Sequence, residues 1–302
     1  MPPNRAARVR VPVATVWSLP ESPRKVDAPA ITALPNYREW LAKMTREETI
    51  ALCAEKRIQT QVLFGDPLNI EAFDREWAKV SIPSQSTSKS RTGYSGWIPT
   101  VQLEIDLDGS KESESVVIFQ PFATLTLSNN AVIELSYATL LELVAEYSDH
   151  LTVSTPLGRG TLLHNDCLFL QRKTQPSDGL SIVQQANRFL GLPYLWGGMS
   201  AYGFDCSGFC YTIYRASGYL IPRDACDQFT SGSVVSREEM LPGDLLFFAY
   251  ENGKGKVHHV GIYVGHQQMI HSPTPGSRIR INALPGTIYE RELCGVRRYW
   301  KS

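Results

Sequence analysis

Residues 191–209 read GLPYLWGGMSAYGFDCSGF and decide the fold of the C-terminal part of the chain. A glycine-rich turn leads here directly to Cys206, and apolar residues such as Phe209 and Ile213 then follow at helical spacing. Asp205 stands where a helix N-cap is expected. Free backbone N–H groups and the helix dipole lower the pKa of a thiol in the first helical turn and can stabilise an oxyanion. We therefore predict a helix that begins at a nucleophilic Cys206, with the Cys206 N–H as an oxyanion donor.

A strand further along the chain supplies a base for this thiol. Residues 257–264 read VHHVGIYV, and strict alternation places His259 on one face with Gly261 and places His258 on the opposite face. The missing side chain at Gly261 leaves room for a helix N-terminus, so His259 is the predicted base and His258 the alternative.

A third group is needed to orient the imidazole of the base, and His271 lies on the next predicted strand. A three-residue turn over 265–267 would pair Gly261 with His271 and place His271 on the face of His259. A two-residue turn would place it on the opposite face. We therefore expect the three-residue turn.

The cysteines offer a rival interpretation as a zinc site. Cys206 and Cys210 are one helical turn apart, and His258 and His259 follow, but this is not a standard ligand spacing. We expect Cys210 to be a core residue and expect no metal. The remaining cysteines do not resemble a disulfide framework and are interpreted as buried thiols: Cys53, Cys167, Cys226 and Cys294.

The first two thirds of the chain contain short apolar strands, at 11–17, 61–63 and 97–101, which predict a small β-barrel. A helix is expected over 45–56, where Thr45 and a glutamate three residues later form a capping box. Strand and turn patterns between 116 and 170 predict a second barrel, and the stretch 171–179 is a candidate linker. Helices followed by strands then indicate an α+β domain. The predicted domains are 1–100, 101–172 and 173–302.

Composition sets limits on the partners. The 302 residues are 43% hydrophobic and 20% charged, with 30 basic and 30 acidic side chains, so the overall charge gives no sign of a nucleic-acid or membrane partner. No secretory signal and no apolar run of about 20 residues is visible. We expect a cytoplasmic protein, or a secreted or wall-associated one if a leader is missing from the chain as given.

The motif blocks, taken in order, resemble the NlpC family of papain-like cysteine peptidases that cleave bacterial cell-wall peptides. The match covers about residues 178 to 300, and its blocks are 193–198 (PYLWGG), 205–209 (DCSGF), 259–263 (HVGIY) and 270–272 (IHS). The resemblance implies that Cys206 is the nucleophile, His259 the base and His271 the orienting residue.

The N-terminal part resembles the first bacterial SH3-like domain of YkfC-like γ-D-glutamyl-L-diamino acid endopeptidases, which carry two such domains before the catalytic one. The matching blocks are 13–17 (VATVW), 60–66 (TQVLFGD) and 93–99 (GYSGWIP). In that group the first SH3-like domain closes one end of the cleft. A tyrosine and an acidic residue from it, with the aspartate and serine beside the nucleophile, bind the L-Ala ammonium of the substrate. By resemblance these residues are Tyr94, Asp66, Asp205 and Ser207, with Tyr194 nearby in its motif.

We predict two SH3-like barrels followed by a papain-like α+β domain. The expected activity is hydrolysis of the γ-D-glutamyl-L-diamino acid bond of murein peptides with a free N-terminal L-Ala, in cell-wall peptide recycling. The diamino acid, diaminopimelate or lysine, stays open. The alternatives are a secreted peptidoglycan hydrolase anchored by its SH3-like domains and a catalytically idle wall-peptide binding protein. We expect a monomer that uses no cofactor and whose partner is the murein peptide.

Overall fold

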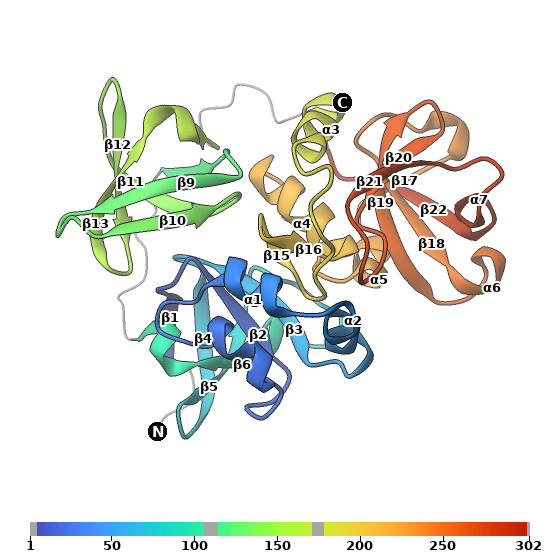
Figure 1. The fold of residues 1–302 in the computed structure, drawn as a ribbon. Helices are drawn as coiled ribbons and strands as arrows, with labels where there is room; N and C mark the ends of the chain where they lie inside the picture. Colours follow the sequence, from blue (N-terminus) through green and yellow to red (C-terminus); the bar gives the residue numbers. More distant parts are fainter. Residues whose placement is uncertain (1–4, 106–113, 171–177, 301–302) are drawn as a thin grey trace.

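A computed structural model of the chain describes residues 5–105, 114–170 and 178–300 and contains two β domains and a mixed α+β domain (Figure 1). Each of the three domains is built on its own sheet of six or seven strands. The candidate linker over 171–179 falls mostly outside the described residues. Within the described residues, no helix is long and apolar enough to cross a membrane.

The first domain holds a seven-stranded antiparallel sheet in the order β3-β2-β6-β5-β4-β1-β7. The sheet extends to Ile105, beyond the boundary expected near residue 100. Its apolar residues form a core of their own, to which Val16, Val62 and Ile98 contribute. The elements are β1 (Arg5–Val9), β2 (Val13–Trp17), β3 (Ile58–Leu63), β4 (Pro67–Asp74), β5 (Trp77–Ile82), β6 (Tyr94–Pro99) and β7 (Leu103–Ile105), with 3-10 turns η1 (Lys25–Ala30) and η2 (Thr100–Gln102).

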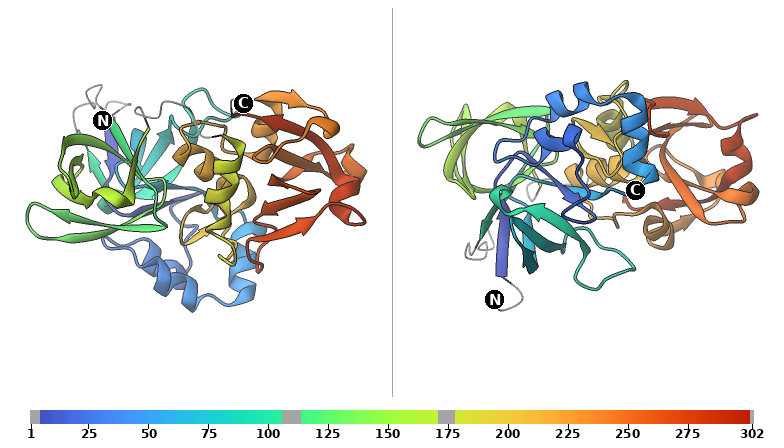
Figure 2. Two further views of the ribbon diagram at one scale, coloured as in Figure 1. Left: turned by 90° about the horizontal axis from the view of Figure 1, so that it is seen from above. Right: turned by 60° about the horizontal axis from the view of Figure 1, so that its bottom comes forward.

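Two helices, α1 (Tyr37–Lys43) and α2 (Arg46–Ala54), are inserted between β2 and β3. The predicted capping box at the start of α2 is confirmed, since the Thr45 side chain accepts from the Glu48 N–H and the Glu48 carboxylate accepts from the Thr45 N–H. The sequence analysis missed α1. Its Tyr37 ring stacks on Tyr202 of the third domain at 5.3 Å, and Figure 2 shows both helices beside that domain.

The second domain repeats the topology of the first. Its strands run in the order β10-β9-β13-β12-β11-β8-β14, which is the order of the first sheet with each number raised by seven. A 3-10 turn again precedes the last strand. The two domains are therefore structural repeats. The elements are β8 (Ser115–Ile118), β9 (Phe122–Leu127), β10 (Val132–Ser136), β11 (Leu140–Glu146), β12 (His150–Thr155), β13 (Gly158–Leu163), η3 (His164–Asp166) and β14 (Cys167–Phe169).

The third domain packs helices against one antiparallel sheet of order β17-β22-β18-β19-β20-β21. Helix α4 buries Phe209 and Ile213 in the same core as Val260 and Ile262 of β19, as its apolar stripe predicted. The elements are α3 (Gly179–Asn187), β15 (Met199–Ser200), β16 (Gly203–Phe204), α4 (Cys206–Ala216), α5 (Ala225–Thr230), β17 (Ser233–Val235), η4 (Arg237–Glu239), β18 (Leu245–Ala249), α6 (Tyr250–Gly253), β19 (Val257–Gly265), β20 (Gln268–His271), β21 (Arg280–Ala283), α7 (Ile288–Glu292) and β22 (Leu293–Arg298).

Strand β3 of the first domain, at the edge of its sheet, meets the glycine-rich turn of the third domain. The carbonyl of Ile58 accepts from the Trp196 indole N–H at 3.0 Å, and the Gln61 amide oxygen accepts from the Met199 N–H at 3.0 Å. Gly197 approaches so closely that a Cβ there would lie 2.6 Å from the Ile58 side chain. These contacts hold the first domain beside the segment that leads to Cys206.

Candidate active site

The nucleophile predicted from the sequence lies at the first position of α4. Asp205 is the N-cap, and its Oδ1 accepts from the Gly208 N–H at 2.6 Å. A Cβ on Gly208 would lie 2.2 Å from the Gly198 carbonyl oxygen, so glycine is required there for the turn to pack on the helix. The glycine-rich turn and the helix start therefore fix the position of Cys206.

The structure brings His259 and His271 together and leaves His258 apart. The His259 Nε2 lies 2.7 Å from the His271 Nδ1, and both side chains are buried. His258 instead stacks on Tyr250 at 4.0 Å, and its Nε2 lies 3.1 Å from a carboxylate oxygen of Glu292. Strand alternation thus separated the two histidines correctly.

The turn that joins β19 and β20 differs from the expected one. It has two residues, His266 and Gln267, both with positive φ (50° and 54°), between the paired residues Gly265 and Gln268. A β-bulge at Val264 adds one residue to β19 and restores the register, with Ile262 opposite Ile270. His271 therefore lies on the face of His259 as expected, but the bulge places it there, not a three-residue turn.

The space at Gly261 is used differently from the expectation. A Cβ on this glycine would lie 2.8 Å from the Met269 sulfur and 3.1 Å from the His271 Cβ. The glycine therefore makes room for the neighbouring strand β20 and for the third histidine, not for a helix N-terminus.

The sequence analysis missed two residues that contact the histidine pair. The Asn282 Oδ1 on β21 lies 2.9 Å from the His271 Nε2. The Tyr289 ring on α7 stands perpendicular to the His271 ring, with centroids 5.1 Å apart, and lies 6.0 Å from the His259 ring. Neither residue falls in a motif block, and only the pairing of β20 with β21 brings Asn282 to this place.

Burial sets the resting protonation of the site. Burial and the neighbouring Asp205 carboxylate raise the pKa of the Cys206 thiol to about 12, although the Ser207 and Val260 N–H groups act in the opposite direction. Burial also lowers the pKa of His259 well below its ordinary value and that of His271 to about 4. The expectation of a lowered thiol pKa is therefore wrong.

Arg223 binds both residues that flank the nucleophile. Its guanidinium donates to the Asp205 Oδ2 at 2.6 Å, to the Ser207 Oγ at 2.9 Å and to the Thr60 Oγ1 of β3 at 2.8 Å. All four side chains are buried. This ion pair holds the start of α4 and ties it to the first domain.

The two tyrosines named from the resemblance, Tyr94 and Tyr194, have different partners. The Tyr94 hydroxyl donates to the carboxylate of Asp224, the residue after Arg223, at 3.0 Å. Tyr194 is buried, and the charges of Cys206 and Asp205 act on it together with burial to raise its pKa well above the ordinary value. The structure thus places Asp205 and Ser207 on either side of Cys206 and Tyr194 close to it, whereas Tyr94 is linked to this region through Asp224.

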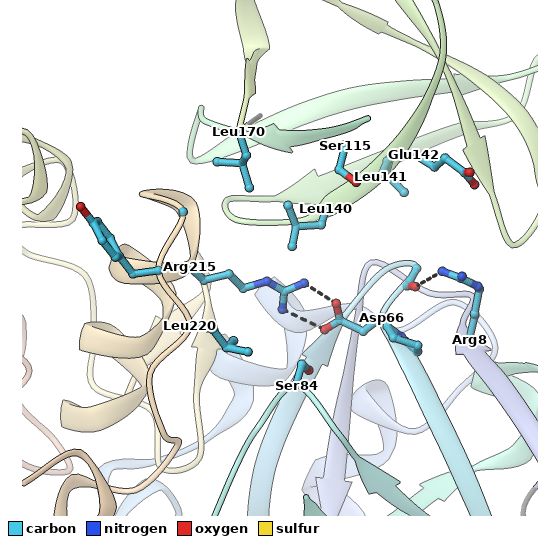
Figure 3. A pocket seen from close by; sticks show the side chains of 14 residues that line it. Arg8, Asp66, Ser84, Ser115, Leu140, Leu141, Glu142, Leu170, Arg215 and Leu220 are labelled. Atoms are coloured by element: carbon cyan, nitrogen blue, oxygen red, sulfur yellow. Dashed lines mark hydrogen bonds and ion pairs between the residues drawn. The ribbon is translucent and has the colours of Figure 1, made fainter. Parts of the chain in front are cut away.

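Asp66 lies elsewhere, which corrects its predicted role. Its carboxylate forms a buried, two-bond ion pair with Arg215 and accepts from the Leu63 N–H at 2.9 Å (Figure 3). Arg215 lies nine residues after Cys206 in α4, about 14 Å along the helix axis. The pair borders a cavity of about 510 Å³ lined by residues of all three domains. Asp66 therefore fixes the domains to one another, away from the nucleophile.

The residues of the rival zinc site are not gathered. Cys210 is fully buried in the apolar core, and His258 turns to Glu292. Over the described part of the chain, the residues that could together hold a metal are Asp224, Cys226 and Asp227. The two carboxylates of that group already accept from the Lys89 ammonium at 2.7 Å and the Ser88 N–H at 3.1 Å.

Comparison with known proteins identifies the family of the chain. The model of the NlpC/P60 family matches residues 191–298. A γ-D-glutamyl-L-lysine dipeptidyl-peptidase of Bacillus subtilis (strain 168) is 46% identical over 287 residues, which cover 95% of this chain and 96% of the relative. The chain belongs to the NlpC/P60 family. A relative of the same name from Bacillus cereus is 36% identical, with 97% of this chain and 90% of the relative covered.

A solved structure supports the same assignment. The crystal structure of an NlpC/P60 family protein from Bacillus cereus ATCC 10987 matches with a TM-score of 0.91 and 35% identity, over 98% of this chain and 100% of that chain. This NlpC/P60 protein is a cysteine peptidase, as the motif blocks implied, with two SH3-like domains before the catalytic domain.

Proposed function

We propose that the protein hydrolyses the bond between γ-D-glutamate and the L-diamino acid of murein peptides, and that it releases L-Ala-γ-D-Glu from a free N-terminus. The names of the two Bacillus relatives that match nearly the whole chain describe this linkage with lysine as the diamino acid, and they describe removal of a dipeptide. The observation that carries the proposal is the contact between the first domain and the residues beside the nucleophile. Arg223 donates both to Asp205, the residue before Cys206, and to Thr60 of the first domain.

The chemistry follows from the arrangement of the side chains. The Cys206 sulfur attacks the γ-glutamyl carbonyl carbon while the thiol proton passes to His259, and the carbonyl oxygen becomes an oxyanion near the Cys206 N–H. Collapse of this intermediate breaks the C–N bond, and His259 returns the proton to the amine of the leaving diamino acid. Water, deprotonated by His259, then hydrolyses the thioester and frees the sulfur.

The free amine end of the substrate gives a role to the remaining residues. A buried ammonium needs a carboxylate and oriented acceptors. Beside the nucleophile, Asp205 supplies the carboxylate and the Ser207 hydroxyl supplies an acceptor. The Tyr94 hydroxyl supplies a further acceptor from the first domain.

Mass spectrometry of peptide digests tests this function. L-Ala-γ-D-Glu-L-lysine and its diaminopimelate counterpart are incubated with the protein, each beside its N-acetylated form and with a Cys206→Ala control. We expect release of L-Ala-γ-D-Glu from the free peptides. The acetylated peptides should be cleaved at least a hundredfold more slowly, because loss of the hydrogen bonds to the charged ammonium costs about 3 kcal/mol of binding free energy. Equal cleavage of both forms would reject the role of the free amine, and no cleavage of either would favour a binding protein.

The place of the enzyme in the cell follows from the same requirement. Peptides with a free L-Ala are released fragments, because intact wall peptides carry L-Ala in amide linkage. We therefore propose that the protein is a cytoplasmic monomer that recycles murein peptides, not a secreted hydrolase. Cell fractionation with an antibody and sedimentation of the purified protein test these two statements.

A further inference from the structure

The contact between His259 and His271 can form with the hydrogen on either of the two nitrogens. The His259 Nε2 lies 2.7 Å from the His271 Nδ1, and two neutral imidazoles can share one proton there in either direction. If His259 donates, its Nδ1 keeps the lone pair that must take the thiol proton. If His271 donates, the His259 Nδ1 carries a hydrogen and cannot act as a base.

Asn282 decides between these two cases. Its Oδ1 lies 2.9 Å from the Arg280 Nε and 2.9 Å from the His271 Nε2. An arginine can only donate, so the side-chain atom of Asn282 that faces both groups is the oxygen, which can only accept. The His271 Nε2 must therefore carry a hydrogen. A neutral His271 then has its lone pair on Nδ1, and the His259 Nε2 donates to it.

We propose that Asn282 is a positioning residue for catalysis, which fixes the tautomer of His271 and through it the tautomer of His259. Asn282 lies opposite Met269 in the pairing of β20 with β21, one diagonal step from His271, and touches neither the nucleophile nor the base. Arg280 holds the amide oxygen in place, and the perpendicular Tyr289 ring limits rotation of His271. Burial, which keeps His271 neutral near pH 7, supports the assignment.

The proposal deepens the peptidase function and rests on it, so cleavage of the free tripeptide by the unaltered protein is measured first. Absence of that cleavage would count against the proposed function and not against Asn282. The informative variants are Asn282→Leu, which keeps the size but loses the acceptor, and Asn282→Asp, which keeps the acceptor and adds a charge. Ile281→Ala on the same strand, with a side chain on the opposite face and 40% exposed, is the matched control.

We expect Asn282→Leu to lower kcat at least tenfold with KM changed less than twofold, and Ile281→Ala to leave both unchanged. Asn282→Asp should restore kcat above neutral pH and move the acid limb of the pH profile to higher pH, because a carboxylate beside His271 favours the imidazolium. Histidine ¹⁵N spectra should show the hydrogen of His271 on Nε2. A full kcat in Asn282→Leu, an unmoved acid limb in Asn282→Asp, or a hydrogen on the His271 Nδ1 would each overturn the proposal.

Discussion

The buried histidine pair links the catalytic site to the stability of the protein. In the folded protein, burial lowers the pKa of His271 to about 4, with the positive charge of Arg280 in the same direction, whereas an unfolded histidine titrates near 6.5. Between these values the unfolded chain binds a proton that the folded protein does not. The contribution of His271 to stability is therefore full above pH 6.5 and is lost as the pH falls toward 4.

We expect the free energy of unfolding to fall by about 1.4 kcal/mol per pH unit in this window from the titration of His271, with a further fall from His259, whose pKa burial also lowers. Urea unfolding at pH 7.5, 6 and 5 measures the slope in the unaltered protein and in a His259→Gln/His271→Gln variant. Other groups titrate equally in both proteins, so the difference between the two slopes reports the pair. A difference that stays constant with pH would show that the histidines do not titrate differently in the folded and unfolded states.

At the scale of elements, local signals predicted the starts of α2 and α4 well and strand register only in part. The capping box of Thr45 and the N-cap of Asp205 act within a few residues, so their sequence carries the full information. The face of His271 depends on turn length and on bulges together. The sequence displays Gly265 but not the bulge at Val264, which only the packing of β19 against its neighbours determines.

The missed residues have the same physical cause. Helix α1 has seven residues and buries only Tyr37 and Trp40, which is too short a stretch for helical periodicity to be visible. Asn282 stands on a strand whose other three residues are exposed, and Asp66 stands in a loop. Their positions follow from how sheets and domains pack, because the residues they contact are distant in sequence. The nucleophile, the base and the third histidine could be found because they belong to contiguous motifs.

The β19–β20 turn itself allows a prediction, because its two central residues have left-handed backbone conformations that favour asparagine and glycine. A His266→Asn/Gln267→Gly variant should raise the free energy of unfolding by about 1 kcal/mol, since side chains other than glycine or asparagine pay a steric cost there. The register and the bulge should persist, so kcat should not change. Chemical denaturation and peptide assays check both points. A loss of kcat would mean that the turn residues, and not the bulge, hold His271 in place.

At the scale of the whole molecule, the repeated β domains contact the catalytic domain in different ways. The first domain presents Thr60 and Gln61 of its edge strand to the flank of the nucleophile. The second presents Ser136, whose Oγ accepts from the Ala201 N–H at 2.9 Å, and Tyr137, which donates to Gln185 of α3. One topology therefore packs beside the residues that flank Cys206 in one copy and supports α3 and the segment before α4 in the other.

Substitutions in the Asp66–Arg215 ion pair test whether this contact links the domains without taking part in substrate binding. Asp66→Asn leaves the buried Arg215 guanidinium without its counter-charge, and breaking one side of a buried pair costs about 3–5 kcal/mol of stability. Because Asp66 lies far from Cys206 along α4, we expect KM for the free tripeptide to stay within twofold in the fraction that remains folded at low temperature. Tyr94→Phe should raise KM about tenfold, which corresponds to one charged hydrogen bond, and should lower stability less than Asp66→Asn does, because it removes one hydrogen bond to the partly exposed Asp224 carboxylate and leaves no buried charge unpaired. An Asp66→Leu/Arg215→Met variant, which removes both charges, should recover much of the stability that Asp66→Asn loses. Calorimetry and initial rates on the same samples separate the two effects. A strongly raised KM in Asp66→Asn at full folding would return this carboxylate to the substrate site and would contradict its role as a link between domains.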